Sequence, residues 1–438
     1  MLDLRTIDTP PVDAVPAEQE PTVFYDQQVP WRLATRIAFR LTFVYISLYV
    51  LTTQMLGGLL ILPVGNLPNL GATGYMKGVV SWTATHVFKV TTPFMTINTG
   101  SGDKTVDWVH AFCLLVFAVA VSAAWSIADR KRANYVRLNK WFRIFLRFAV
   151  GATMIGYGMV KAIPLQMPAP SLQRLVEPFG NFSPMGVLWY SVGASFPYER
   201  FAGFAELTGA VLLFVPPLAV LGALVVLADS IQIFTLNMTY DVPVKLFSFH
   251  LIVMCLVLLA PEVRRLVRAI VVARPRRLAM ALQLAFAAYI IGMNLYSARQ
   301  AWMQRGGGAP KSPLYGIWNV EEMQVDGVLR AGLIGDYGRW RRLIFQNPTS
   351  ISFQRMDDSF QVYGAKADMN AKTLALTNAA DKNWGARFAI QQQAPDRMVL
   401  EGEMDGHKVR FDLHLYDRSN FLLLNRGFSW IQERPFNR

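Results

Sequence analysis

The chain has 438 residues, of which 53% are hydrophobic and only 17% are charged, and this composition argues against an ordinary soluble domain. The formal net charge is +13, but the basic residues flank long apolar runs and form no groove-sized patch with interleaved aromatic residues. A nucleic-acid partner is therefore disfavoured, and membrane lipids are the expected partners of the basic loops. The sequence is typical of a polytopic α-helical membrane protein.

The first segment, residues 1–33, is acidic and rich in proline. It lacks the basic start, short apolar core and small-residue cleavage site of a secretory signal peptide. We expect a disordered cytosolic tail here, followed by a transmembrane helical domain over residues 34–304.

Uncharged or nearly uncharged stretches follow, several of them long enough for the ~20 residues that a bilayer crossing needs. They lie near residues 41–63, 108–128, 148–160, 201–228, 246–261 and 278–298. The fourth stretch belongs to a longer run that Pro216-Pro217 interrupts, which predicts two helices joined by a tight turn. The expected total is about seven transmembrane helices.

Lysine and arginine are concentrated in two of the connections between these crossings, residues 129–143 and 262–277. The connections of opposite parity around residues 164–198 and 237–243 carry only Arg174 and Arg200, at or near their ends. Cytoplasmic loops are enriched in Lys and Arg, so the N-terminus is expected inside and the part of the chain after residue ~300 outside the cytoplasm.

A Gly- and Pro-containing linker, residues 305–313, precedes a domain of different composition at residues 314–438. Turn signals such as Asp326-Gly327 and Asp405-Gly406 recur there about every ten to twelve residues, which predicts an antiparallel meander. Over residues 409–415 apolar and polar side chains alternate, so one face of this strand is expected to be buried. About eight or nine such strands would close into an all-β up-and-down barrel with no free edge.

The first strand of this domain begins Gly316-Ile317-Trp318, which resembles the GxW opening of lipocalin-type barrels. The resemblance implies that Arg426, in the predicted last strand, packs over Trp318 at the closed end of the barrel. In the alternative, Trp318, Phe428 and Trp430 simply fill a small barrel and leave no cup for a ligand.

Several ionisable side chains fall within predicted crossings, where each costs ~2.5–3.5 kcal/mol on insertion scales and requires a partner or a function. With alternating helix directions they map to the outer half of the bundle, where we predict a polar pocket roofed by the barrel domain. The pocket residues are His250, Glu206, Lys161, Asp229, Tyr157, Gln232, Lys245 and Asp241.

Structural explanations compete with a functional one at these positions. Lys161 can snorkel to the surface, or it can pair with Glu206 to fix helix packing. Asp241 can cap the helix that follows it, with Pro243 in its first turn. His250 lies deeper in the bundle and is harder to explain by structure alone.

His110 and His250 lie at similar predicted depth on different helices, as bis-His haem ligation requires, so a haem or metal protein is one alternative. Outside this alternative we assign no metal ligands. Cys113 and Cys255 fall inside predicted helices without CxxC or zinc-ligand spacing, and we interpret them as buried apolar residues.

Residues 141–263 contain "YGMVK" at 157–161 and the run "FAGFAELTGAVLLFVPPLAVLGALVVL", which begins at Phe201. These motifs resemble the DoxX-like family of small four-helix membrane proteins. Members of that family are similar to membrane subunits of quinone-linked oxidoreductases. The resemblance therefore implies an integral membrane oxidoreductase component that handles a lipid-soluble quinone or another lipid.

Quinone reduction needs proton donors beside an apolar slot, and the polar residues of the predicted pocket are compatible with this chemistry. The candidate catalytic residues are His250, Glu206, Lys161 and Asp229. The candidate cofactor-binding residues are Tyr157, Gln232, Lys245 and Asp241. The sequence shows no nucleotide motif, flavin fingerprint or thiol pair to supply electrons, so a redox partner protein or a bound cofactor is required.

The expected location is the bacterial cytoplasmic (inner) membrane. A further alternative is not enzymatic: the bundle anchors an extracytoplasmic barrel that binds a hydrophobic ligand or assembles with envelope proteins.

Overall fold

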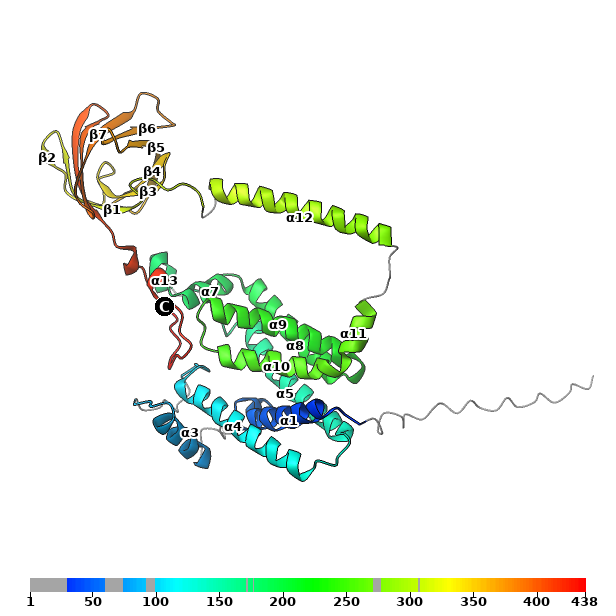
Figure 1. The fold of residues 1–438 in the computed structure, drawn as a ribbon. Coiled ribbons are helices and arrows are strands. Elements are labelled where there is room, and N and C mark those ends of the chain that lie inside the picture. Colours follow the sequence, from blue (N-terminus) through cyan, green and yellow to red (C-terminus); the bar gives the residue numbers. More distant parts are fainter. Residues whose placement is uncertain are drawn as a thin grey trace, which may run out of the picture. The chain divides into compact units, whose positions relative to one another are not determined.

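A computed structural model describes residues 30–59, 74–91, 99–170, 172–175, 177–270, 277–305 and 308–438. The expected cytosolic tail, residues 1–33, lies outside these ranges except for its last four residues. The chain divides into two compact units (Figure 1). The helical unit comprises Met1–Pro178, Phe182–Val267 and Gly427–Arg438, and the second unit comprises Phe179–Asn181 and Arg268–Arg426.

The regular secondary structure of the described residues before the barrel is helical. The α-helices are α1 (Leu33–Thr52), α2 (Met55–Leu59), α3 (Gly74–His86), α4 (Thr105–Ala128), α5 (Val136–Ala162), α6 (Leu172–Leu175), α7 (Pro184–Gly193), α8 (Phe196–Phe214), α9 (Ala219–Thr239), α10 (Lys245–Leu259), α11 (Val263–Ile270) and α12 (Arg277–Arg305).

Within the described residues, six helical segments are long and apolar enough to cross a membrane. They are Leu33–Thr52, Thr105–Ala128, Val136–Ala162, Pro216–Thr239, Lys245–Arg268 and Met280–Gln304. These segments confirm the apolar stretches read from the sequence, with the exception of α8. This helix, the remaining one of the seven expected crossings, carries Glu199, Arg200 and Glu206 within its 19 residues.

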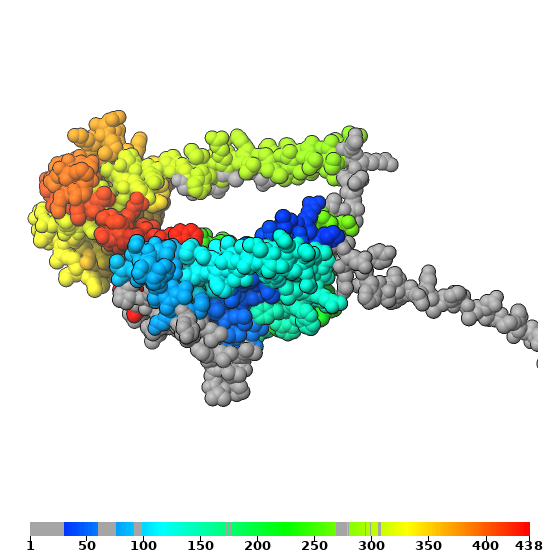
Figure 2. All heavy atoms as spheres, turned by 60° about the horizontal axis from the view of Figure 1, so that its bottom comes forward, coloured from blue at the N-terminus to red at the C-terminus, as the bar shows by residue number. Residues whose placement is uncertain are grey.

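The outward face of α4 is apolar. Its exposed large side chains are Phe112, Leu115, Val116, Phe117 and Val119. In Figure 2, α4 is the cyan helix on the surface of the helical unit. An exposed apolar face of this size on a long helix is what contact with lipid tails requires.

The helix pair α8 and α9 confirms the turn predicted at Pro216-Pro217. α8 ends at Phe214 and α9 begins at Ala219, with both prolines in a short 3-10 turn between them. The two helices then pack closely, because a Cβ atom on Gly222 would lie only 2.5 Å from the backbone nitrogen of Leu213.

The second unit contains a closed antiparallel barrel. Its strands are β1 (Gly316–Val325), β2 (Val328–Leu329), β3 (Trp340–Asn347), β4 (Ser350–Arg355), β5 (Phe360–Asp368), β6 (Thr373–Thr377), β7 (Gly385–Ala394), β8 (Arg397–Met404) and β9 (His407–Leu415). Each strand from β3 to β9 pairs with its neighbour in the chain, and β1 pairs with both β3 and β9. The eight strands β1 and β3–β9 therefore close the barrel, and β2 is a short addition to β1.

The β8–β9 hairpin confirms the pattern read from the sequence. Asp405 and Gly406 form its two-residue turn with φ angles of 51° and 80°, between the paired residues Met404 and His407. The alternating apolar residues of β9 face inward, and Val409, Phe411 and Leu413 are buried.

Aromatic side chains fill the barrel interior. The ring of Trp340 stacks on Phe353 at a centroid distance of 3.6 Å and on Phe411 at 5.1 Å. Trp318 is buried as well, and its indole N–H donates to the carbonyl of Leu314 at 3.0 Å. These contacts favour the filled barrel over a ligand-holding cup.

The end of the chain differs from the expected strand. The last strand, β9, ends at Leu415, and Arg426 follows the short helix α13 (Leu422–Asn425), so its placement in the last strand was wrong. Phe428 and Trp430 belong to the helical unit and do not fill the barrel. The barrel domain is therefore shorter than the expected 314–438.

Candidate functional site

The predicted pairing of Lys161 with Glu206 is present between α5 and α8. The Nζ atom of Lys161 donates to Oε1 of Glu206, and both side chains are buried. The other carboxylate oxygen, Oε2, is buried and has no hydrogen-bond partner among the described residues. A buried carboxylate with an unused acceptor can take up or release a proton, so this pair can do more than fix helix packing.

Two glycines allow α5 and α8 to approach at this pair. A Cβ atom on Gly203 would lie 2.4 Å from the backbone nitrogen of Ala162, and one on Gly158 would lie 2.9 Å from the carbonyl oxygen of Gly203. Small residues at this contact let the two helix backbones approach closely. The close approach also explains how Lys161, near the end of α5, reaches Glu206 on α8.

Asp229 on α9 lies within electrostatic range of the Lys161–Glu206 pair. Its Oδ2 atom is buried and has no hydrogen-bond partner among the described residues. Gln232, predicted to accompany it, is exposed on the same helix. The structure thus brings together three of the four candidate catalytic residues, and the fourth, His250, has a partner on α1 instead.

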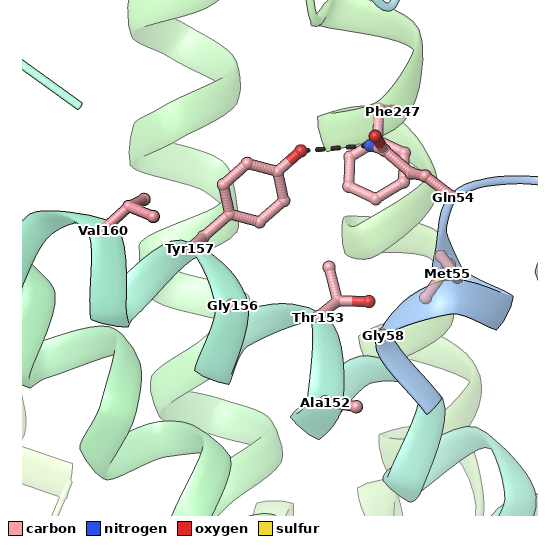
Figure 3. A pocket seen from close by; sticks show the side chains of 9 residues that line it. All are labelled: Gln54, Met55, Gly58, Ala152, Thr153, Gly156, Tyr157, Val160 and Phe247. Carbon is pink, nitrogen blue, oxygen red and sulfur yellow. Dashed lines mark hydrogen bonds between the residues drawn. The ribbon is translucent and has the colours of Figure 1, made fainter. Parts of the chain in front are cut away.

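A hollow of about 240 Å³ lies between α2, α5 and α10 (Figure 3). Apolar side chains and two glycines form most of its lining, and Phe247 closes one side. Its polar groups include the hydroxyl of Tyr157 and the amide of Gln54, which are hydrogen-bonded to each other at 3.1 Å. The lining residues are Gln54, Met55, Gly58, Ala152, Thr153, Gly156, Tyr157, Val160 and Phe247.

Tyr157 connects the hollow with the buried ion pair. It lies one helical turn before Lys161 on α5, and the Lys161 ammonium is 5.9 Å from the centre of its ring. Glu206 also lies within electrostatic range of the Tyr157 hydroxyl. An apolar hollow with a few directed polar groups is the usual form of a small-molecule site.

His250 lies against α1. Its Nδ1 atom contacts the carbonyl oxygen of Leu246 at 2.7 Å, and its Nε2 atom contacts the hydroxyl of Tyr45 at 2.8 Å. A carbonyl only accepts, so Nδ1 carries the proton, and in the neutral ring Tyr45 donates to Nε2. The imidazole also stacks on Tyr49 at 3.8 Å.

These contacts do not fit the haem alternative. Both ring nitrogens of His250 are already hydrogen-bonded, so neither is available to a metal ion in this arrangement. His110, the other proposed ligand, is buried on α4, and its Nε2 atom has no partner among the described residues. The described part of the chain holds no group of three or more His, Cys, Asp or Glu side chains placed to bind a metal.

Lys245 and Asp241 belong to a separate ionic cluster with Asp103. The Nζ atom of Lys245 lies 3.1 Å from Asp241 and 3.5 Å from Asp103, and all three side chains are buried. Asp103 also accepts the backbone N–H groups of Lys245 and Leu246, both at 2.9 Å. Asp103 therefore caps α10, and the cap expected from Asp241 was wrong.

Burial raises the pKa of Asp103, which lies outside the membrane-spanning segments. The two amide hydrogen bonds and the Lys245 ammonium act in the opposite direction and lower it. The α10 amides and the Lys245 ammonium together support the charged form of this carboxylate.

Residues Gly427–Arg438, the tail segment, pack on this cluster. The backbone N–H of Ser429 donates to Oδ1 of Asp241 at 3.0 Å. Gln432 donates its backbone N–H to the carbonyl of Asp103 at 2.9 Å and its side-chain amide to the carbonyl of Asp241 at 3.0 Å. The ring of Phe428 lies 5.1 Å from the Lys245 ammonium.

The tail segment also contacts the starts of two other helices. Oε1 of Glu433 accepts the backbone N–H of Thr105, the first residue of α4, at 3.0 Å. The carbonyl of Arg438 accepts the backbone N–H of Ser183 at 2.8 Å, next to the first turn of α7. The segment therefore holds the ends of α4, α7 and α10 together.

Sequence reasoning missed Gln54, Tyr45 and Asp103. Tyr45 and Gln54 are uncharged polar residues in or next to the first apolar stretch, where hydropathy gives no signal. Asp103 precedes α4, and nothing local connects it with a helix 142 residues further along the chain.

Fold and site together define a two-unit protein, with a helical unit rich in candidate membrane spans and buried ion pairs, joined to a closed antiparallel barrel. No protein-family model matches the chain, and no solved structure matches it. The chain is 33% identical over 124 residues to the uncharacterized protein YwoB of Bacillus subtilis (strain 168), and the match covers 28% of this chain and 76% of YwoB. The chain belongs to the same family as YwoB, and its likeness to DoxX-like proteins stays a prediction.

Proposed function

We propose that this chain is a multi-pass protein of the bacterial cytoplasmic membrane whose helical unit binds a lipid-soluble quinone as a component of an oxidoreductase. The observation that carries the proposal is the hollow of about 240 Å³ in which Tyr157 and Gln54 present polar groups, with the Lys161–Glu206 ion pair one helical turn away. In this proposal the barrel domain lies on the outer side of the membrane.

The residues around the hollow match the needs of a quinone. Phe247, Met55 and Val160 offer apolar contact for a ring. Tyr157 and Gln54 can exchange their mutual hydrogen bond for bonds to one ring carbonyl oxygen. Glu206, with its unused Oε2, is suited to pass protons through Tyr157.

Reduction of a quinone to a quinol takes two electrons and two protons. In this proposal a redox partner protein delivers the electrons, and the buried pair delivers the protons. Glu206→Gln would leave a hydrogen-bond partner for Lys161 but would remove the group that titrates. We expect such a variant to bind quinone and to lose turnover.

Binding can be tested directly on protein extracted in mild detergent. Mass spectrometry and ultraviolet absorbance of the lipid extract would show a co-purifying quinone, and titration with a short-chain quinone would give its affinity. Tyr157→Phe should weaken the affinity roughly threefold to tenfold, because one hydrogen bond is lost. Tyr198→Phe, at an exposed tyrosine of α8, is the matched control. Equal affinities for all three proteins, or no measurable binding, would reject the quinone site.

The membrane arrangement is part of the same proposal. We infer that α8 is a seventh crossing, held between α5 and α9, and that the N-terminus lies inside and the barrel outside. Supporting this, the tail segment contacts the starts of α4 and α10, whereas the basic loops follow the other ends of these helices. A membrane-impermeant maleimide should label Lys382→Cys in intact cells and Lys131→Cys only after lysis. The reverse pattern would contradict the orientation.

A second candidate function is an anchor that presents the barrel to envelope proteins. One observation favours it: the strand β2 and the loop after it expose a group of large apolar side chains, Val328, Leu329, Leu333, Ile334 and Tyr337. Exposed apolar groups of this kind often mark interaction surfaces. Ile334→Asp should then abolish cross-linking to the partner in cells, while Val362→Asp, at an exposed valine elsewhere on the barrel, should not.

A further inference from the structure

The turn between α4 and α5 encloses a second, polar hollow of about 270 Å³. It is lined by residues 132–137, which include Arg132 and Arg137. Both arginine side chains are exposed, and both are at the rim of a cavity that none of the candidate catalytic residues lines.

Two arginines of α1 donate hydrogen bonds to the backbone of this turn. Arg36 donates to the carbonyls of Arg130 and Arg132, and Arg40 donates to the carbonyl of Asp129 at 3.0 Å. The Arg40 guanidinium is buried and also donates to the hydroxyl of Tyr135. Three carbonyl oxygens of the turn are therefore engaged by cations.

The charge around the hollow is strongly positive. Residues 129–143 contain six basic residues, Arg130, Lys131, Arg132, Arg137, Lys140 and Arg143, and a single acid, Asp129. Asp129 accepts a hydrogen bond from the Tyr135 hydroxyl, and Arg143 is paired with Glu262. Among the described residues, Arg132 and Arg137 form no ion pair with a carboxylate, so their charges are available to an anion.

The turn also lies at a membrane boundary. Two candidate spans meet at it, because α4 ends at Ala128 and α5 begins at Val136. The exposed Trp141, near the start of α5, is an aromatic residue of the kind common at the level of lipid head groups. A guanidinium recognises a phosphate through paired N–H donors. The two arginines that line this hollow can supply such donors.

We propose that this hollow is a binding site for a phosphate group, carried by an anionic phospholipid of the membrane leaflet at this face. Arg132 and Arg137 hold the phosphate oxygens, and Arg36 and Arg40 keep the turn open for it. The site is independent of the quinone hollow, which other residues line.

The test uses the full chain in detergent micelles. Phosphatidylglycerol, phosphatidylcholine and inorganic phosphate are added separately, and binding is measured by native mass spectrometry and thermal shift. The site variant is Arg132→Ala/Arg137→Ala. The control variant is Arg264→Ala/Arg265→Ala, which removes two exposed arginines near the end of the candidate span Lys245–Arg268.

The wild type should bind phosphatidylglycerol and not phosphatidylcholine, and the site variant should weaken this binding about thirtyfold, with the control near wild type. If inorganic phosphate displaces phosphatidylglycerol from the wild type but does not bind the site variant, the phosphate site is also supported and accepts a soluble anion. Equal losses in both variants would attribute binding to general surface charge and overturn the proposal. Equal binding of both lipids would overturn it as well.

Discussion

Replacing Lys245 with methionine isolates the energetic role of the buried ionic cluster. The lysine is 1% exposed and lies between two carboxylates, Asp241 at 3.1 Å and Asp103 at 3.5 Å. Methionine fills a similar volume without the charge, so Lys245→Met leaves two buried carboxylates facing one another. We expect the helical unit to lose stability and the tail segment to lose its attachment.

The magnitude follows from the distances. At an effective dielectric constant of about 20, an ammonium 3.1 Å from a carboxylate oxygen is attracted by about 5 kcal/mol. The cost of taking the ions out of water offsets much of that attraction, and removing one partner of a buried pair costs about 3–5 kcal/mol. For a unit of this size, we expect Tm to fall by roughly 10 °C.

The loss should depend on pH in a defined direction. Burial raises the pKa of Asp103 in the folded protein, so its charged form destabilises the fold once Lys245 is gone. That penalty is fully present above the folded-state pKa and is relieved as the pH falls through it and the carboxyl takes up a proton. The Tm difference between Lys245→Met and wild type should therefore be larger near about pH 8 than near about pH 5.

Hydrogen exchange and thermal unfolding in detergent provide the assay. Amides of the tail segment, above all Ser429 and Gln432, should exchange faster in Lys245→Met because their acceptors lie on Asp241 and Asp103. Lys77→Met, at an exposed lysine of α3, is the control and should change stability by less than about 0.5 kcal/mol. Unchanged exchange in the tail segment together with a Tm near wild type would refute this account of the cluster.

Two further outcomes are expected. Gly203→Ala should destabilise the helical unit by about 1–3 kcal/mol in thermal unfolding, because its Cβ would meet the backbone of Ala162, while Gly78→Ala, with open space around it, should be neutral or stabilising. In the barrel, a hydrogen bond from Arg330 lowers the pKa of Asp336, so their contact contributes stability above the unfolded pKa of ~3.9 and loses it as the pH falls through the folded value. At neutral pH, Asp336→Asn should therefore lower the opening free energy of this loop, measured by hydrogen exchange, by at most about 1 kcal/mol. In strong acid the variant should match wild type.

The barrel was predictable because its signals are local. Each turn dipeptide and each alternating strand lies within a few residues, as at Asp405-Gly406, and closure follows from pairing neighbours in order. The pairing of Lys161 with Glu206 was predictable for a different reason. A buried charge on an apolar helix needs a counter-charge, and few were available among the neighbouring spans.

Contacts between distant parts of the chain could not be predicted in this way. The cap of α10 comes from Asp103, and the cluster around it is completed by Gln432 from the tail segment. The stretch around Arg426 has the apolar and aromatic composition of a strand, so composition alone placed it in the barrel. Its short helix and the positive φ of Gly427, 64°, redirect the chain toward the helical unit.

The two groups of buried charges differ in what surrounds them: the tail segment packs on the cluster around Lys245, whereas the Lys161–Glu206 pair lies next to Tyr157. Around Lys245, every charge has an opposite charge within 3.5 Å, and backbone amides of the tail segment and α10 add hydrogen bonds. Such a network fixes one arrangement and resists change. Each group keeps a buried polar atom without a hydrogen-bond partner among the described residues, Nζ of Lys245 in the first and an oxygen of Glu206 and of Asp229 in the second. The second group differs in its neighbour Tyr157, which lines the hollow. An unsatisfied buried acceptor is costly to maintain, so a proton or a ligand group that satisfies it during function is the physical reason to retain it.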